Sequence, residues 1–221
     1  MLRERKSWAF LLTWIFFASK FALGSTPTKP VIGSSCHSDD ASQICLGLKY
    51  VVYADHDGKP TASRAMLAKD LDGINKIWGK YGIEFQVDEY DVVQPEKFGL
   101  RYNTAESSEL DAIRKTFDNN TDLLVVVTGP WDRKGSLGDS SANSWTSMPG
   151  APPYGVILEK PVATFPNIIA HELGHYLNLE HVTDTTDVMN PVIYASSTKL
   201  YDEQSRTARL AAENFWRNTW R

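Results

Sequence analysis

The chain lacks a basic stripe, and its 221 residues carry a formal net charge of −4. This balance argues against nucleic acid as a partner, because nucleic-acid binders usually concentrate positive charge. Internal repeats are also absent, as is any obvious linker between two large domains. With 42% hydrophobic residues, the chain has enough apolar material for one globular domain with a sizeable core.

The apolar run near the N-terminus, residues 8–19, is short for a membrane-spanning helix, which needs about 20 residues. Its flanks resemble those of a secretory signal, with basic Arg3, Arg5 and Lys6 before it and the small-x-small site Ala22-Leu23-Gly24 after it. We therefore predict a signal peptide over residues 1–24, a secreted or periplasmic protein, and no stable membrane span after processing. A membrane anchor is the alternative interpretation.

Hydrophobic patterning predicts alternating strands and helices after a loose segment, residues 25–46, that is rich in Ser, Thr, Pro and Gly. The expected elements are a strand at 48–54, a helix at 62–81, strands at 83–87 and 123–127 around a short helix at 109–117, an edge strand at 154–159, and a last helix from Asp202. Residues 129–153 show little pattern and are expected to form a functional loop or to be disordered. This order predicts an α+β fold.

Three of the five histidines lie in the segment HELGHYLNLEH, from His171 to His181. On a helix, His171 and His175 lie one turn apart on the same face, so both imidazoles can contact one metal ion. Zinc accepts three neutral imidazoles and one water, and the open fourth position is typical of a catalytic site. Glu172 is placed to take a proton from that water. The segment therefore indicates hydrolytic chemistry.

Asn178 explains how the third histidine can join the other two. His181 follows His175 by six residues, which is too far for both to remain on one helical face. The helix must end and the chain must turn back. Asn is the second choice after Gly for the left-handed conformation that ends a helix, so Asn178 is expected at that break.

The string resembles the signature of the metzincin zinc peptidases, H-E-x-x-H-x-x-G-x-x-H, with Asn178 in the glycine position. Metzincins also carry a methionine in a tight turn, and the segment DVMNP around Met189 resembles that turn. Its Asn-Pro pair favours a turn independently. The resemblance covers residues 154–216, and upstream it rests on the order of elements alone.

The resemblance implies a zinc endopeptidase, in which His171, His175 and His181 bind one catalytic Zn²⁺ and Glu172 acts as general base. Met189 would form the floor of the site without binding the metal. The implied catalytic domain spans residues 47–221.

The implied fold is a twisted, mostly parallel sheet with an antiparallel edge strand, an active-site helix, and a small irregular C-terminal subdomain that ends in a helix. The expected edge strand at 154–159 would pair with a protein or peptide substrate bound as an extended strand. The branch of the metzincins stays unassigned, because Val182 after the third histidine matches none of the usual choices. Pro191 stands where some branches have a tyrosine, and Tyr194 is out of register.

Cys36 and Cys45 are the only cysteines, and in an exported protein they predict a disulfide that closes a small loop. The alternative is a cysteine that binds the zinc in a latent form, although the residues around Cys36 do not resemble the latency motif of the matrix metalloproteases. Asp132 and Asp139 could bind calcium, but they lack calcium-loop spacing, and solvated carboxylates are the preferred interpretation.

The sequence leaves two alternatives to the metzincin interpretation open. One is an HExxH peptidase that uses a downstream glutamate, Glu203 or Glu213, as its third zinc ligand. The distance from His175 to His181 in the sequence argues against it. The other is a non-catalytic zinc-binding interaction protein on the same fold, which the intact Glu172 does not favour.

Overall fold

The computed structural model of the protein describes residues 31–33, 36 and 42–221. The predicted signal peptide at 1–24 lies outside the described residues and stays a prediction. Among the described residues, no helix is long and apolar enough to cross a membrane.

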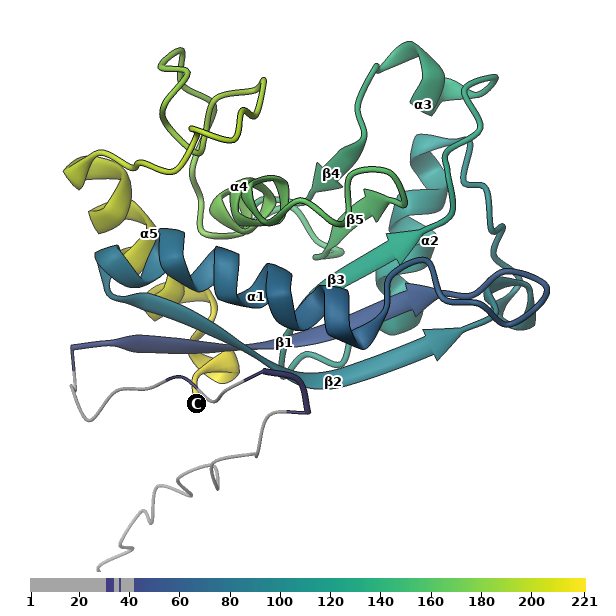
Figure 1. Ribbon diagram of the computed structural model, residues 1–221, viewed down its shortest axis with the longest axis horizontal. Helices are drawn as coiled ribbons and strands as arrows, with labels where there is room; N and C mark the ends of the chain where they lie inside the picture. The colour runs from purple at the N-terminus through teal and green to yellow at the C-terminus, as the bar shows by residue number, and fades with distance from the viewer. Residues whose placement is uncertain (1–30, 34–35, 37–41) are drawn as a thin grey trace, which may run out of the picture.

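Five strands form one mixed sheet in the order β2-β1-β3-β5-β4 (Figure 1). The strands are β1 (Ile44–Tyr53), β2 (Ile83–Val93), β3 (Leu123–Thr128), β4 (Ser144–Thr146) and β5 (Val156–Glu159). The pairs β1–β2, β1–β3 and β3–β5 are parallel, and β4 runs antiparallel to β5. The predicted α+β fold, a mostly parallel sheet with an antiparallel edge strand, is confirmed.

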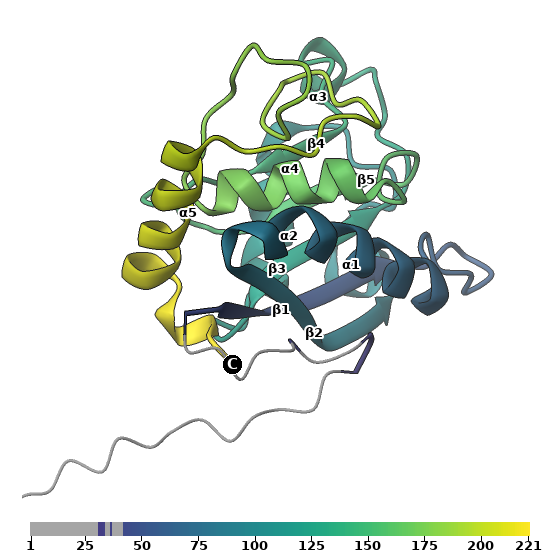
Figure 2. The same cartoon turned by 60° about the vertical axis from the view of Figure 1, so that its left-hand side comes forward.

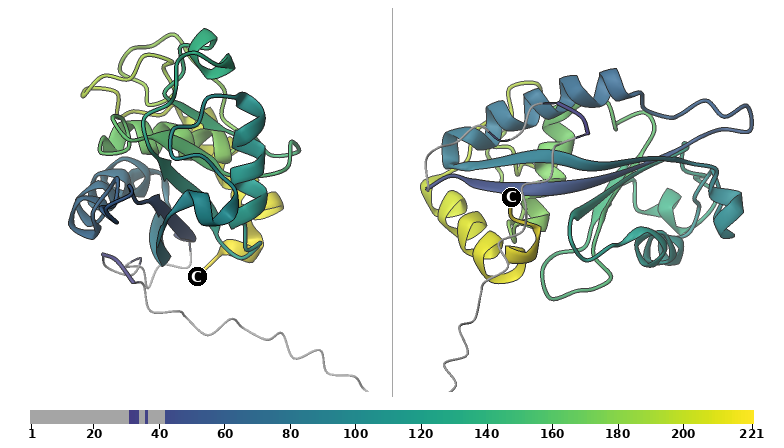
Figure 3. Two further views of the ribbon diagram at one scale, coloured as in Figure 1. Left: turned by 90° about the vertical axis from the view of Figure 1, so that its right-hand side faces the viewer. Right: turned by 90° about the horizontal axis from the view of Figure 1, so that it is seen from below.

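Helices cover both faces of this sheet. They are α1 (Arg64–Trp78), α2 (Ser107–Phe117), the short α3 (Ser136–Asp139), α4 (Pro166–Tyr176) and α5 (Asp202–Phe215), with 3₁₀ turns at Gly79–Tyr81, Pro95–Phe98 and Arg217–Thr219. Helices α1 and α4 lie side by side (Figure 2), and α2 covers the opposite face (Figure 3, left view). The motif helix α4 therefore lies between α1 on one side and strands β4 and β5 on the other.

Alternation along the buried strands divides the core in two. In β3, Val125 and Val127 pack on the side of α1 and α4, whereas Leu124 and Val126 pack on the side of α2. The continuous apolar run that predicted a central strand thus serves both faces. Across the first core, the indole of Trp78 donates a hydrogen bond to the carbonyl of Ala170 (3.1 Å) and fixes α4 against α1.

The position of the edge strand was predicted wrongly. The run at 154–159 contains β5, which is buried on both faces between β3 and β4, so it is not an edge. The true edge is β4, only three residues long, inside the stretch 129–153 that showed no pattern. Three residues are too few for a period of two to stand out, and a doubly buried strand loses the polar alternation of an edge.

The segment before the sheet is tied to it in two ways. A disulfide joins Cys36 to Cys45 of β1, with 5.8 Å between the Cα atoms, as predicted. Ile32 forms an antiparallel bridge with Val87 of β2. Strand β1 begins at Ile44, ahead of the predicted domain boundary at 47.

Candidate metal centre

Helix α4 carries the first two histidines and the glutamate. It begins with Pro166, whose fixed φ suits the first helical position, and its apolar residues Ile169 and Leu173 are fully buried. His171 and Glu172 are almost fully buried, and His175 is partly exposed. The helix therefore turns its histidines toward an opening while its other side anchors it in the core.

The helix ends as Asn178 predicts. Asn178 has φ of 65°, in the left-handed region. Its N–H donates to the carbonyl of His175 (3.0 Å), and the N–H of Leu179 donates to the carbonyl of Gly174 (2.9 Å). This pair of bonds is the Schellman arrangement, which satisfies the last carbonyls while the chain reverses. The reversal brings His181 back over α4.

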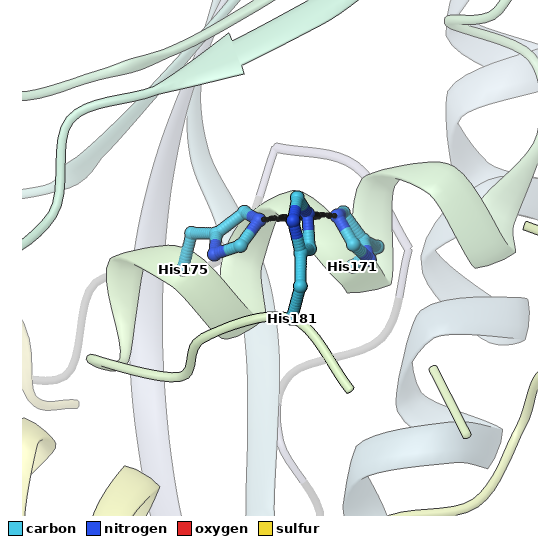
Figure 4. A group of neighbouring side chains, drawn as sticks. All are labelled: His171, His175 and His181. Atoms are coloured by element: carbon cyan, nitrogen blue, oxygen red, sulfur yellow. Dashed lines mark hydrogen bonds between the residues drawn. The ribbon is translucent and has the colours of Figure 1, made fainter. Parts of the chain in front are cut away.

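The three imidazoles converge on one point (Figure 4). The Nε2 atoms lie 3.1 Å apart for His171 and His175, 3.2 Å for His175 and His181, and 3.3 Å for His171 and His181. Tetrahedral zinc with bonds of 2.0–2.1 Å holds ligand nitrogens roughly 3.3 Å apart. The triad can therefore hold a metal ion, and its spacing fits zinc.

The opposite nitrogens of two rings are held by backbone carbonyls. His171 Nδ1 lies 2.7 Å from the carbonyl oxygen of Val188, and His175 Nδ1 lies 2.7 Å from that of Leu179. A carbonyl only accepts, so each Nδ1 carries the proton and each Nε2 keeps its lone pair for a metal. Such carbonyl partners fix the tautomer and the orientation of ligating histidines.

Burial also lowers the pKa of His171 and of His181. Desolvation, followed by the charge of His175, lowers the pKa of His171 to about 3. The same two causes, in the same order, lower the pKa of His181, while Glu172 acts in the opposite direction. Neutral imidazole is the form that binds metals, so this environment favours ligation.

The turn around Met189 lies directly beneath α4. The Asp187 carboxylate accepts a hydrogen bond from the Met189 N–H (2.7 Å), and the N–H of Val182 donates to the Met189 carbonyl (3.0 Å). Met189 is fully buried, and a Cβ added at Gly174 would overlap its sulfur atom. The glycine within the motif therefore makes room for the methionine.

The carboxylate of Glu172 faces β4. Its Oε1 accepts a hydrogen bond from Ser144 Oγ (2.6 Å), and its Oε2 accepts one from Thr146 Oγ1. The sequence did not indicate these two hydroxyls, because β4 itself was not predicted. Their period-two spacing was the only signal that could have found them.

Comparison with known families decides the identity. The family model of the matrixins, peptidase family M10, matches residues 96–207, about half of the chain, and this span includes the triad and the Met189 turn. The chain belongs to the matrixin family. It is a zinc metalloendopeptidase of that family, and the predicted resemblance to metzincins is confirmed.

Two solved structures are similar to this chain, and the first of them supports the fold. Archaemetzincin from Methanopyrus kandleri is 15% identical, with a TM-score of 0.53, and the alignment covers 80% of this chain and 100% of that one. Metalloproteinase-II from Bacteroides fragilis is 14% identical, with a TM-score of 0.47, over 85% of this chain and 59% of that one. The matrixin chain thus spans little more than half of the Bacteroides chain. No curated protein sequence matches it.

The three histidines of this matrixin line a cleft of about 610 Å³. Its wall on one side is the segment 140–146, which includes β4, and on the other side is Pro191–Ile193 just after the Met189 turn. Glu172 and the three histidines lie between these walls. Tyr194 does not line the cleft, consistent with its position out of register.

The other predicted residues lie outside the triad. Within the described part of the chain, the three histidines are the one group of metal-type ligands that converges, and neither Glu203 nor Glu213 belongs to it. Both glutamates are exposed on α5. Asp132 and Asp139 join no such group among the described residues either.

Proposed function

We propose that this matrixin domain is a secreted zinc-dependent endopeptidase, in which His171, His175 and His181 hold the catalytic zinc and Glu172 is the general base. The observation that carries the proposal is the convergence of three imidazole Nε2 atoms within 3.3 Å of one another, on and beside the helix that also carries Glu172. Met189, packed against Gly174, would support the site from below.

When bound, zinc supplies a Lewis acid for the scissile carbonyl and lowers the pKa of a water to about 7. The chain's own residues then handle the proton. The carboxylate of Glu172 accepts a proton from the attacking water and donates it to the nitrogen of the leaving amine. The carbonyls of Val188 and Leu179 keep the two helical imidazoles in the required tautomer.

The substrate is proposed to bind as an extended strand along β4. The N–H of Glu159 donates to the carbonyl of Asn143 (3.0 Å), which makes Asn143 a position bonded to β5. Such positions alternate in antiparallel pairs, so the backbone groups of Ser144 and Thr146 point away from β5, toward the open edge. They are available for β-augmentation by a peptide.

Substitution of Glu172 tests the assigned base. The full chain and its variants are expressed and purified. Cleavage of an unfolded protein substrate and the zinc bound to each purified variant are measured on the same sample. We expect Glu172→Ala to abolish cleavage while zinc stays bound, and His181→Ala to lose both zinc and activity. Glu203→Ala, on exposed α5, should match the wild type. Equal cleavage by the Glu172→Ala protein would refute the assignment.

Export rests on the N-terminal sequence alone, and a separate experiment tests it. Expressed with its natural N-terminus in a secreting host, the protein should appear outside the cytoplasm and begin at Ser25 when its N-terminus is sequenced. Retention in the cell with residues 1–24 still attached would contradict the proposed localisation.

A further inference from the structure

The carboxylate of Glu172 is held at both oxygens. Ser144 Oγ donates to Oε1 at 2.6 Å, and Thr146 Oγ1 donates to Oε2. Glu172 itself is 5% exposed. Because each hydroxyl has one proton to give, both protons are committed to the carboxylate, while each oxygen of the carboxylate retains a lone pair for a further donor. The arrangement thus orients the carboxylate without saturating it.

Strand geometry explains why both hydroxyls reach the same carboxylate. Ser144 and Thr146 are two residues apart on β4, so their side chains lie on the same face of the sheet, the face covered by α4. Trp145 between them points to the other face and is 40% exposed. A hydroxyl at only one of the two positions could hold one oxygen and would leave the carboxylate free to rotate.

A buried cation fixes β4 from the opposite face. The guanidinium of Arg114, on α2, donates to the carbonyls of Trp145 (2.9 Å) and Gly155 (3.0 Å). The Arg114 side chain is 3% exposed. A three-residue edge strand has few ladder bonds of its own, so these contacts to β4 and to the start of β5 help to hold the strand in place.

We propose that Ser144 and Thr146 are positioning residues for Glu172, which align its carboxylate for proton transfer. This inference rests on the proposed function of Glu172 as general base. The same two residues turn their backbone groups to the open edge where the substrate would pair. One short strand therefore places both the peptide and the base, so the distance between them is set by a single rigid element.

Kinetics of hydroxyl-deleting variants test the proposal. Thr146→Val keeps the shape of the side chain and removes the hydroxyl, and Ser144→Ala removes the other. Each should lower kcat about tenfold with KM within twofold, because the backbone that binds the peptide is retained while the base is misaligned. Thr146→Ser, which keeps the hydroxyl, should stay within about threefold of wild type.

Ser147→Ala is the matched control, since Ser147 follows β4 and does not line the cleft. It should leave kcat and KM unchanged. An unchanged kcat in Thr146→Val would overturn the proposal, as would an equal loss in Thr146→Ser. A rise in kcat would also overturn it, because the hydroxyls would then restrain the base instead of supporting it.

A double-mutant cycle on the metal-free protein tests the contact without relying on activity. Thr146→Val should lower Tm in the chain with Glu172, because a buried carboxylate loses its donor. It should have little effect on Tm in the Glu172→Ala background. Additive shifts would show that the contact does not exist in solution. If the wild type cleaves no substrate although the cycle is non-additive, the proposed function fails and the contact stands.

Discussion

At the scale of single residues, Asn178 decides whether the third histidine can reach the other two. Helix α4 ends at Tyr176, and the left-handed φ of 65° at Asn178, two residues later, returns the chain toward His181. A side chain with a branched Cβ is strained in this conformation, whereas glycine is not. The cap at Asn178 is thus needed to bring His181 to the metal centre, and not only to end the helix.

Asn178→Gly should leave zinc affinity within about threefold of wild type, because glycine adopts the left-handed conformation freely. Asn178→Val should lower the free energy of unfolding by about 1–2 kcal/mol and weaken zinc binding, since strain at the cap displaces His181. Denaturant titration and zinc competition measure the two effects. Equal zinc affinity in both variants would contradict this role of the cap.

The neutral state of His171 predicts a pH dependence of stability. In the folded protein the pKa of His171 is about 3, whereas in the unfolded chain its imidazole takes up a proton below about pH 6.5. Acid therefore favours the unfolded chain, so this contribution is fully present above about pH 6.5 and is lost as the pH falls toward 3.

Thermal melts of chelator-treated protein between pH 7.5 and 4 measure this loss. The fall in Tm should be shallower in His171→Gln than in the wild type. His56→Gln, at an exposed position, should keep the wild-type slope. A wild-type slope in the His171→Gln protein would show that another group causes the acid sensitivity.

At the scale of elements, the position of β4 depends on Arg114. In Arg114→Met the carbonyls of Trp145 and Gly155 lose a charged donor, which should cost about 2 kcal/mol of stability. Amide exchange of β4 should become faster than in the wild type. Lys115→Met, an exposed change on the same helix, should alter neither quantity. Unchanged exchange in β4 would mean that its pairing with β5 is sufficient.

The elements that the sequence predicted are those with a strong period or a specific breaker. The helical spacing from Leu67 to Trp78, the unbroken apolar run of β3 and the cap at Asn178 each encode their structure locally. Ser144 and Thr146 could not be predicted as partners of Glu172, because their position comes from pairing with β5 and from Arg114, which lies about 30 residues away in the chain. Tertiary contacts of this kind leave no local pattern beyond the two-residue spacing of the hydroxyls.

At the scale of the whole molecule, Arg221 joins the distant parts of the sheet. Its guanidinium donates to Asp88 on β2 and to Asp122 just before β3, and its N–H donates to the carbonyl of Cys45 on β1 (3.0 Å). The side chains of both aspartates are less than 7% exposed. Burial raises the pKa of Asp88, and the contact with Arg221 counteracts this effect.

Arg221→Ala should therefore destabilise the protein by about 3 kcal/mol near neutral pH, since it leaves two buried carboxylates without their cation. The loss should shrink in acid, because protonation of a carboxyl group removes the repulsion. Denaturant titrations at pH 7 and pH 5 measure both effects. Lys49→Ala, which disrupts ion pairs with the exposed Glu89 and Asp91, should cost much less. Equal losses in the two variants would refute the role of Arg221.

The two borders of the sheet also have a consequence for self-association. On the β2 border, Ile32 already pairs with Val87, so part of that edge is occupied by the chain's own N-terminal segment. On the β4 border, the open edge is three residues long. Long unpaired edges promote aggregation, and short ones limit it. The edge at β4, where we propose that a peptide pairs, is therefore too short for the sheet of another copy to extend.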